Sequence, residues 1–499
     1  MAVPEEIRQI ARPVNTVVEG RTNKDGVTRY IVRERSGSVY SEGRSRPKNG
    51  RIVGYIIDGR FVERTDNENV GPEEVSMMTW AVERLALDLT PDVINDLRSV
   101  YSEQEAEMLY TMAILRVRHP DLRNSRMRRD YTESLLSETF PGLPMSKNSV
   151  SEFLHRIGSA GGRIREFLRA RCSRLPAGAL TAVDGMLETD NSCVNNLSAP
   201  SRKTRVRGNR EVSMLFAYSI DRMEPVCFSV YPGNMLDSKA YADFIEENDL
   251  RDAVLIGDKA FTVRAARSQF ESDRKLHYLF PIRRNAEVIA QLRLRDYDGV
   301  LKTYKGVTYH VAFDVRNDVR YYSFRDAERA AEEESAYLEG RKRSGRGIDA
   351  AELAKLRPRW GTMIFQSDLD LPPEAIYEMY MQRWTIEEMF RLYKNIEDFD
   401  DTRVQSDFSV VGEHLVNFIS TLITSRLMGE FLAHGLLDRC GYTEVMEVLR
   451  RALRFRNDRG EWVFRAQTDK EKDALRKLGL MPQLPPKRKP GRPRKNPQS

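Results

Sequence analysis

Residues 374–395 read EAIYEMYMQRWTIEEMFRLYKN, and the interpretation of the whole chain starts from this stretch. It contains neither Gly nor Pro, is rich in Glu, Met, Leu and Arg, and follows Pro372 and Pro373. Strong helix formers behind an N-terminal Pro favour an α-helix. The sequence therefore predicts a helix of about six turns over this stretch.

One face of the predicted helix carries four polar residues: Tyr380, Arg383, Glu387 and Lys394. Their offsets of 0, 3, 7 and 14 place them within roughly 60° of one another at about 100° per residue. Glu388 points about 100° away from Glu387, so we expect a salt-bridge or surface role for it. A solvated face with helical ion pairs commonly produces such a pattern. A functional interpretation needs support from elsewhere in the chain.

The composition is that of a globular protein with several domains. The chain has 499 residues, 31% charged and 40% apolar, a length at which a single core gives way to about two to four domains. The longest apolar helix candidate, 415–432, is interrupted by Asn417, Arg426 and Glu430, which favours buried core over a membrane span. No secretory signal is expected. Scattered Cys residues without a neighbouring His cluster predict a reduced, cytoplasmic protein without a zinc site.

Two segments precede the expected α/β core. Residues 1–75 contain short strand-like runs, which predict a small β-rich N-terminal module. Residues 76–174 are expected to be helical, with one helix over 131–139 and a second over 150–157. Ser149 and Glu152 have the spacing of a capping box at the start of the second helix. These two helices are compatible with a helix-turn-helix DNA-binding motif. They are equally compatible with two packed helices that do not bind DNA.

Residues 175–282 are expected to form the first part of an α/β core with the element order βββαβαβ. Asp184 follows the first strand and Asp258 follows the fourth. The expected elements are strands at 179–183, 212–220, 225–231, 253–256 and 277–282 and helices at 238–247 and 261–272. The later segments are a β-rich insertion (283–370), the second part of the core with the Glu-bearing helix (371–455), a C-terminal segment (456–484) and a basic tail (485–499).

Asp184, Asp258 and Glu387 can form one carboxylate site. The first and fourth strands of such a core are expected to lie side by side, and a helix packed on the sheet can bring up the third carboxylate. Converging carboxylates repel one another unless a cation neutralises them, and hard oxygen ligands select Mg²⁺ or Mn²⁺. Two such ions can stabilise the attacking and leaving oxygens of a phosphoryl displacement. An Asp before Gly is more often a turn residue, but the three positions together favour cleavage or transfer of a phosphodiester.

The spacing Tyr380-(2)-Arg383-(3)-Glu387-(6)-Lys394 resembles the signature of one branch of the DDE transposases of bacterial insertion sequences. The residues next to Asp184 and Asp258 in the sequence are also similar to those next to the two catalytic Asp residues of that family. The resemblance covers roughly residues 175–430. It implies an RNase H-like mixed-sheet core, interrupted by a β-rich insertion before the Glu-bearing helix.

The resemblance also implies roles for these residues. Asp184, Asp258 and Glu387 would be the catalytic ligands of two Mg²⁺ or Mn²⁺ ions, and Tyr380, Arg383 and Lys394 would contact transposon-end DNA. The implied activity is metal-dependent cleavage at terminal inverted repeats and transfer of the 3′-OH into target DNA, by a cut-and-paste route and a homodimer. Some members pass through a hairpin and stack a flipped base on an aromatic residue after the second Asp. This chain offers Phe261 and no Trp there, so the hairpin step stays open.

The basic C-terminal tail is a second indication that the protein binds DNA. Residues 485–499 contain six Lys or Arg and no acidic residue, and they account for the whole net charge of +6. Residues 489–495, KPGRPRK, resemble an AT-hook, in which Arg492 and Arg494 would enter an A·T minor groove. A solubilising tail is the alternative. A nucleoid-associated, cytoplasmic location is expected.

Two other functions remain open. One is an RNase H-like DNA nuclease, or a host-adopted transposase derivative, that cuts without joining. The other is a non-enzymatic DNA-binding protein with structural carboxylates, against which the intact set of Asp184, Asp258 and Glu387 weighs.

Overall fold

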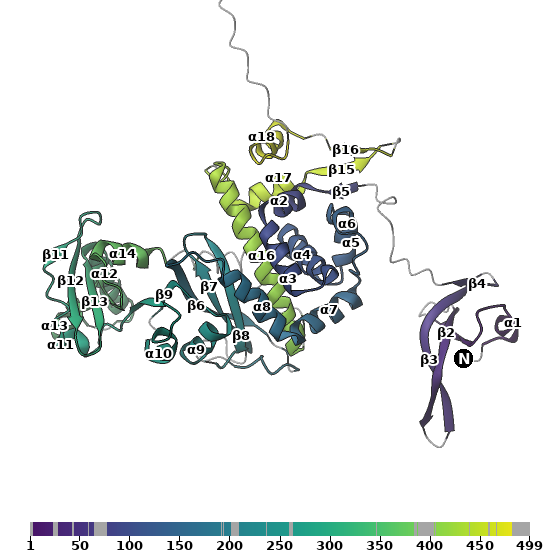
Figure 1. The fold of residues 1–499 in the computed structure, drawn as a ribbon, viewed down its shortest axis with the longest axis horizontal. Coiled ribbons are helices and arrows are strands. Elements are labelled where there is room, and N and C mark those ends of the chain that lie inside the picture. The colour runs from purple at the N-terminus through teal and green to yellow at the C-terminus, as the bar shows by residue number, and fades with distance from the viewer. Residues whose placement is uncertain are drawn as a thin grey trace, which may run out of the picture. The chain divides into compact units, whose positions relative to one another are not determined.

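The computed structural model describes the chain apart from residues 1–2, 23–27, 42–43, 58, 64–76, 191, 193, 201–208, 236, 259–262, 346, 384–386, 388–403, 405, 439, 458–459, 466 and 482–499. Phe261, Glu388, Lys394 and the AT-hook-like tail with Arg492 and Arg494 therefore lie outside the described residues. The chain divides into two compact units, Met1–Glu74 and Val75–Ser499 (Figure 1).

The first unit is a four-stranded antiparallel sheet with the order β1-β2-β3-β4. Val18, Val32 and Ile56 form its small core. Its elements are α1 (Glu5–Arg8), β1 (Thr16–Thr22), β2 (Thr28–Ser41), β3 (Arg44–Ile57) and β4 (Arg60–Glu63). The strand-like runs of the N-terminal sequence are thus strands.

The second unit begins with a layer of helices. They are α2 (Ala81–Leu89), α3 (Pro91–Val100), α4 (Glu103–Arg118), α5 (Met127–Thr132), α6 (Leu136–Thr139), α7 (Lys147–Ser159) and α8 (Gly161–Cys172). The single helix predicted over 131–139 is wrong, because residues between α5 and α6 bond to β5 (Met77–Thr79). Thr79 N–H donates to Glu133 O (2.9 Å), and Leu135 N–H donates to Thr79 O (2.8 Å).

The N-cap of helix α7 lies three residues before the predicted cap. Ser146 is the N-cap, and its Oγ accepts the Ser149 N–H at 3.2 Å. The capping box predicted at Ser149 and Glu152 is therefore wrong. Val150, Phe153, Leu154 and Ile157, which share one face of this helix at i, i+3, i+4 and i+7 spacing, are all buried.

A nine-stranded mixed sheet forms the centre of the second unit, with the order β11-β12-β13-β14-β10-β9-β6-β7-β8. The strands of its first half are β6 (Ala179–Thr189), β7 (Glu211–Ser219), β8 (Glu224–Pro232), β9 (Ala253–Gly257) and β10 (His277–Pro281). Strands β6, β9 and β10 are parallel neighbours, and β7 and β8 are antiparallel to the strands beside them. This is the α/β, RNase H-like sheet expected for the core. Helix α9 (Asp237–Glu247), 3₁₀ helix η2 (Val263–Ala266) and α10 (Arg267–Phe270) connect the strands.

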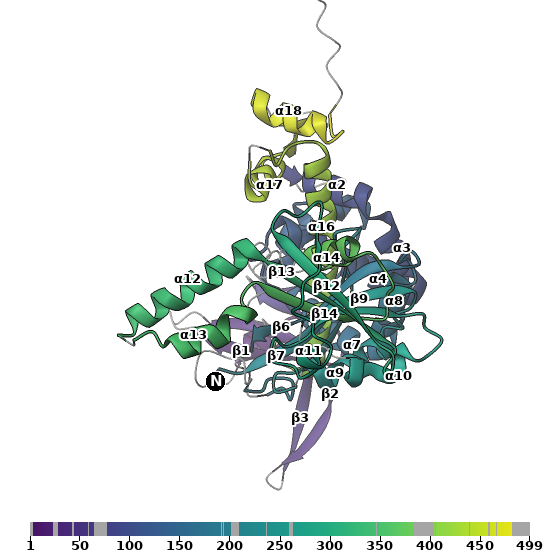
Figure 2. The same cartoon turned by 90° about the vertical axis from the view of Figure 1, so that its left-hand side faces the viewer.

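The insertion continues the same sheet. Strand β14 (Thr362–Ser367) pairs antiparallel with β10, where Phe280 lies opposite Gln366. Strands β11 (Gly299–Val300), β12 (Val307–Asp314) and β13 (Val319–Asp326) extend the sheet beyond β14. Figure 2 shows α12 (Ala327–Arg343) and α13 (Ala350–Leu356) alongside these strands. Strands of the insertion therefore join the sheet of the core, an extension that the sequence did not predict.

Helix α16 (Asp407–Ala433) joins the helical layer to the sheet (Figure 1). It packs against α4, α7 and β8, and the rings of Phe418 and Phe228 are stacked 5.1 Å apart. Residues 415–425 are all buried, which confirms the core prediction for this part of the segment, whereas Arg426 and Glu430 are half-buried and Leu432 is exposed. Among the described residues, no helix is long and apolar enough to cross a membrane.

The chain ends in a small three-stranded sheet and two short helices. Strand β15 pairs with both β16 and the distant β5. These elements are α17 (Tyr442–Arg450), β15 (Leu453–Arg456), β16 (Trp462–Phe464) and α18 (Asp469–Lys477). The sequence interpretation, which assigned residues 371–455 to the second part of the core, did not predict β15.

Candidate active site

Asp184 and Asp258 lie next to each other at one edge of the sheet. Strands β6 and β9 pair in parallel from Ala179 opposite Ala253 to Val183 opposite Gly257. The next residue on each strand is the aspartate. The expected adjacency of the first and fourth strands is thus confirmed, and it places both carboxyl-bearing residues where β9 ends.

Asp184 does not end its own strand, contrary to the prediction. Strand β6 continues to Thr189 because β7 pairs with it along this whole length, with Asp184 opposite Phe216 and Thr189 opposite Glu211. Asp184 is half-buried, and its Oδ1 accepts the Gly185 N–H at 2.8 Å. Because β9 is the shorter strand, the two aspartates lie side by side just after the end of β9 and in the middle of β6.

The uninterrupted helix predicted over 374–395 is wrong at Gln382 and Arg383. Helix α14 runs from Pro373 to Met381, and the next two residues form a turn. The Arg383 N–H donates to Tyr380 O at 3.0 Å, a tighter i to i+3 bond than the helix uses. Glu387 is again helical, and residues 384–386 and 388–403 lie outside the described part of the chain.

Arg383 links two of the three expected catalytic carboxylates. Its Nη2 lies 2.9 Å from Glu387 Oε1, and its Nη1 lies 3.4 Å from Asp184 Oδ2. The guanidinium also lies 5.7 Å from the ring centroid of Tyr380. Burial by itself lowers the pKa of Arg383, but Tyr380, Asp184 and Glu387 outweigh burial and raise that pKa. The site therefore holds a fixed positive charge between Asp184 and Glu387.

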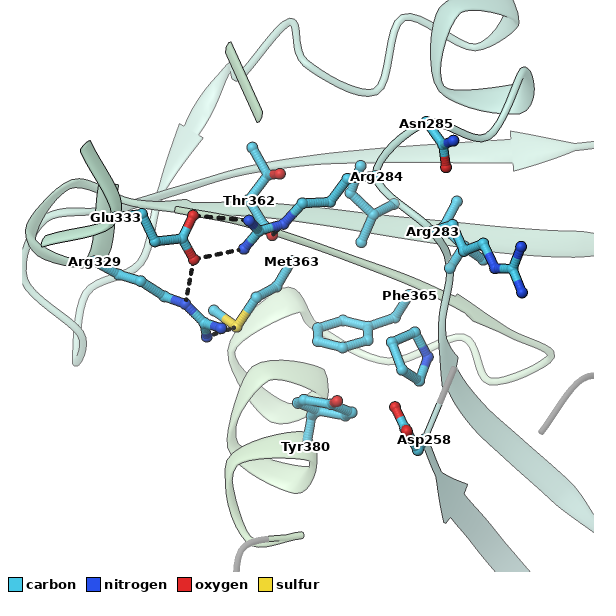
Figure 3. Close-up of a pocket in the computed structure, with 13 residues that line it drawn as sticks. Asp258, Arg283, Arg284, Asn285, Arg329, Glu333, Thr362, Met363, Phe365 and Tyr380 are labelled. Atoms are coloured by element: carbon cyan, nitrogen blue, oxygen red, sulfur yellow. Dashed lines mark hydrogen bonds and ion pairs between the residues drawn. The ribbon is translucent and has the colours of Figure 1, made fainter. Parts of the chain in front are cut away.

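A cavity of about 690 Å³ opens beside Asp258 (Figure 3). Tyr380 and Phe365 form an aromatic wall, with ring centroids 4.2 Å apart. Burial, with a smaller contribution from Asp258, raises the pKa of Tyr380, so its phenol is protonated at neutral pH. The cavity thus brings together a carboxylate, a neutral phenol and an apolar wall.

The insertion supplies a charged group to the same cavity. Arg284 forms a two-point ion pair with Glu333 (2.7 and 2.9 Å), and Arg329 Nε donates to the same carboxylate at 3.2 Å. Although burial opposes it, Arg284 lowers the pKa of Glu333, as do the Gly361 N–H and Arg329. Sequence reasoning missed these residues. The available signal was Arg283-Arg284 directly after the fifth strand, at the edge where Asp184 and Asp258 lie.

The predicted site residues therefore form two connected groups. Asp184, Arg383 and Glu387 are joined by ion pairs, and Asp258 and Tyr380 line the cavity. Tyr380 belongs to both groups through its contact with Arg383. The placement of Lys394, Arg492 and Arg494 lies outside the described residues.

The donor chemistry of this site fits a hard divalent cation, since carboxylate oxygens are the ligands that Mg²⁺ and Mn²⁺ prefer. Over the described part of the chain, no three His, Cys, Asp or Glu side chains come together as a metal-binding group. Instead, Asp184 and Glu387 share the guanidinium of Arg383. A metal ion bound by both carboxylates would compete electrostatically with these ion pairs, because it would place a second positive charge beside the Arg383 guanidinium.

Comparison with known proteins finds a family match over the central part of the chain. Residues 201–423 match the family described as Transposase DDE domain, a match that contains Asp258 and Glu387 and begins after Asp184. No curated protein matches the chain.

Two solved transposase structures are similar. A piggyBac transposase synaptic complex with hairpin DNA has 11% identity and a TM-score of 0.39, over 75% of this chain and 80% of that chain. A Mos1 transposase paired-end complex with the left transposon end has 14% identity and a TM-score of 0.15, over 31% of this chain and 54% of that chain. Over residues 201–423, this chain is therefore similar to the transposases with a DDE domain.

Proposed function

We propose that this transposase cuts DNA at the ends of an insertion sequence and joins the freed 3′-OH to target DNA. The observation that carries the proposal is the parallel pairing of β6 and β9, which sets Asp184 and Asp258 at one level. Arg383 connects Asp184 to Glu387, the third carboxylate of the expected set. The signature spacing supports the bacterial insertion-sequence branch of the family.

Asp184, Asp258 and Glu387 would hold the divalent ions. When bound, two such ions supply Lewis-acid stabilisation of the attacking and leaving oxygens of the phosphodiester. Asp184 and Asp258 would orient the scissile phosphate, because their strands fix them side by side. Arg383 would turn from a carboxylate to a DNA phosphate, which is a good partner for its planar fork of N–H donors.

Tyr380 and Lys394 would position DNA next to the cut. The protonated phenol of Tyr380 can donate a hydrogen bond to a phosphate or sugar oxygen beside Asp258. Lys394 would contact the backbone further along the end. Arg492 and Arg494 would add an A·T-preferring contact in the minor groove. Double-stranded DNA with inverted repeats, bound by a homodimer, is the proposed substrate, and the nucleoid is the proposed location.

The deciding experiment uses the genomic flanks of the gene. A donor DNA with the flanking inverted repeats should be cleaved by the full-length protein in the presence of Mg²⁺, with 3′ ends joined to a target plasmid. Asp258→Asn should bind the same DNA and leave it uncut. Cleavage without joining would instead indicate the nuclease, and binding without cleavage under any divalent ion would indicate the DNA-binding protein.

A further inference from the structure

We propose that Arg283, together with Asn285, binds a backbone phosphate of the DNA strand that passes Asp258. The inference rests on the proposed function only in taking DNA as the ligand of this edge of the sheet. It assigns a contact to the first residues of the insertion.

The sheet topology places Arg283 after the strand next to the one that Asp258 follows. Strand β10 is the parallel neighbour of β9, with Leu279 opposite Ile256. It ends at Pro281, and Arg283 follows two residues later. Neighbouring strands are about 4.8 Å apart, so this segment lies one strand beyond Asp258 along the same edge. A DNA strand that lies along this edge past Asp258 meets the Pro281–Asn285 segment next.

Arg283 differs from the other arginines of the 690 Å³ cavity. Figure 3 shows Arg284 and Arg329 converging on Glu333, while Arg283 points away from that carboxylate. The Arg283 side chain is exposed, and no carboxylate within the described residues pairs with it. The Asn285 side chain is also exposed and makes no hydrogen bond within that part of the chain. The fold leaves their N–H donors available to a ligand.

A second hollow of about 1000 Å³ lies against the same segment. Pro281, Ile282, Arg283 and Asn285 line both hollows, so Arg283 stands where they adjoin. The second hollow is lined by charges of both signs, because Arg264 and Arg267 line it together with Glu271, Asp318 and Asp368. Arg283 adds a positive charge where the two hollows adjoin, which favours an anion at that point.

The chemistry of the two side chains selects a phosphate. A guanidinium presents a planar fork of donors that matches two phosphate oxygens, and an Asn amide adds a further donor. Contacts of this kind hold the backbone of DNA without reading its sequence. Arg283 would thus hold the strand in register with the carboxylates, as a positioning residue and not as a catalytic one.

The test measures the binding of the full-length protein to a fluorescent duplex of about 30 base pairs, over about 50 to 300 mM KCl. Arg283→Ala should weaken binding about tenfold at low salt and make the slope of log K against log salt shallower by about 0.9. Arg283→Lys should keep the slope, because the charge remains. Arg343→Ala is the matched control, since Arg343 is an exposed arginine at the end of α12.

Equal binding curves for Arg283→Ala and Arg343→Ala would overturn the inference. Because the Arg283 side chain is exposed, its removal should leave the melting temperature unchanged, which separates lost contacts from lost folding. The result is independent of catalysis. If the wild-type protein fails to cut donor DNA but Arg283→Ala still loses one phosphate contact, the proposed activity fails and this inference stands.

Discussion

Arg383 and Glu387 form an ion pair of 2.9 Å within the signature itself, and the same guanidinium reaches Asp184 at 3.4 Å. Two residues that are expected to have different partners, DNA and metal, thus neutralise each other in the described structure. The pairing has a simple physical reason, because two half-buried carboxylates at one site repel one another unless a cation lies between them. Metal binding and DNA binding should therefore be coupled through Arg383.

Arg383→Gln should increase the affinity of the DNA-free protein for Mn²⁺. The substitution removes the positive charge that competes for Asp184 and Glu387, and we expect an affinity gain of about tenfold. Calorimetric titration of wild type and variant with Mn²⁺ measures the change. Glu387→Gln, which removes a ligand, is the opposite control and should bind Mn²⁺ more weakly. Unchanged or weaker Mn²⁺ binding by Arg383→Gln would show that Arg383 does not compete with the metal.

Glu387→Gln should abolish Mg²⁺-dependent cleavage while leaving DNA affinity within about threefold of wild type, since it removes a charge needed at the metal and adds no steric bulk. Glu388→Gln is the matched control, because the same change on the next residue should retain most of the cleavage activity. Cleavage and binding are measured on the same end-labelled donor DNA. The reverse result, with Glu388 essential and Glu387 dispensable, would show that the signature has been placed in the wrong register.

The sequence was sufficient to predict the part of the site that follows from the order of strands and helices along the chain. The βββαβ order alone was enough to place Asp184 and Asp258 on neighbouring strands, since parallel strands at adjacent positions share one edge. The ion pair between Arg383 and Asp184 was not predictable in this way. It requires α14 to end at Met381 and a tight turn to follow, whereas the local composition favours an unbroken helix.

The sheet extension could not be predicted for a different reason. Strand β14 pairs with β10 through Phe280 and Gln366, which are far apart in sequence. Such pairing depends on non-local register, on which strand propensity carries no information. Glu333 reaches the cavity only because this pairing brings α12 to the catalytic edge, and its contact with Arg284 was missed for the same reason.

Gly158→Ala should destabilise the protein by about 2 kcal/mol or more, because α7 and α16 touch at this residue. A Cβ at Gly158 would lie 1.7 Å from Phe408 O, so the helices would have to move apart. Gly429→Ala in α16 is the matched control. Nothing lies within 4 Å of a Cβ there, and replacing a helical Gly by Ala should stabilise by up to about 1 kcal/mol. Urea unfolding followed by circular dichroism measures both, and equal midpoints for the two variants would contradict this close packing.

His414 should make stability depend on pH in the acidic range. It is fully buried in α16, where burial and then the nearby Arg116 lower its pKa to about 3, although Glu188 Oε2 lies 3.6 Å from Nδ1. The unfolded chain binds a proton below its ordinary value of 6.5, while the folded protein resists it, so acid favours unfolding. The free energy of unfolding should fall by about 1.4 kcal/mol per pH unit well below pH 6.5, or roughly 2 kcal/mol between pH 6.5 and 4.5.

Urea titrations at those two pH values measure this contribution. His414→Gln should lose the drop of roughly 2 kcal/mol whatever its absolute stability, because its side chain does not titrate. The exposed His155 gives a matched control, and His155→Gln should keep the wild-type dependence. If the drop persists in His414→Gln, the buried imidazole is protonated in the folded protein and pairs with Glu188 as a cation. The interior between α16 and β6 would then contain a charged pair instead of a neutral one.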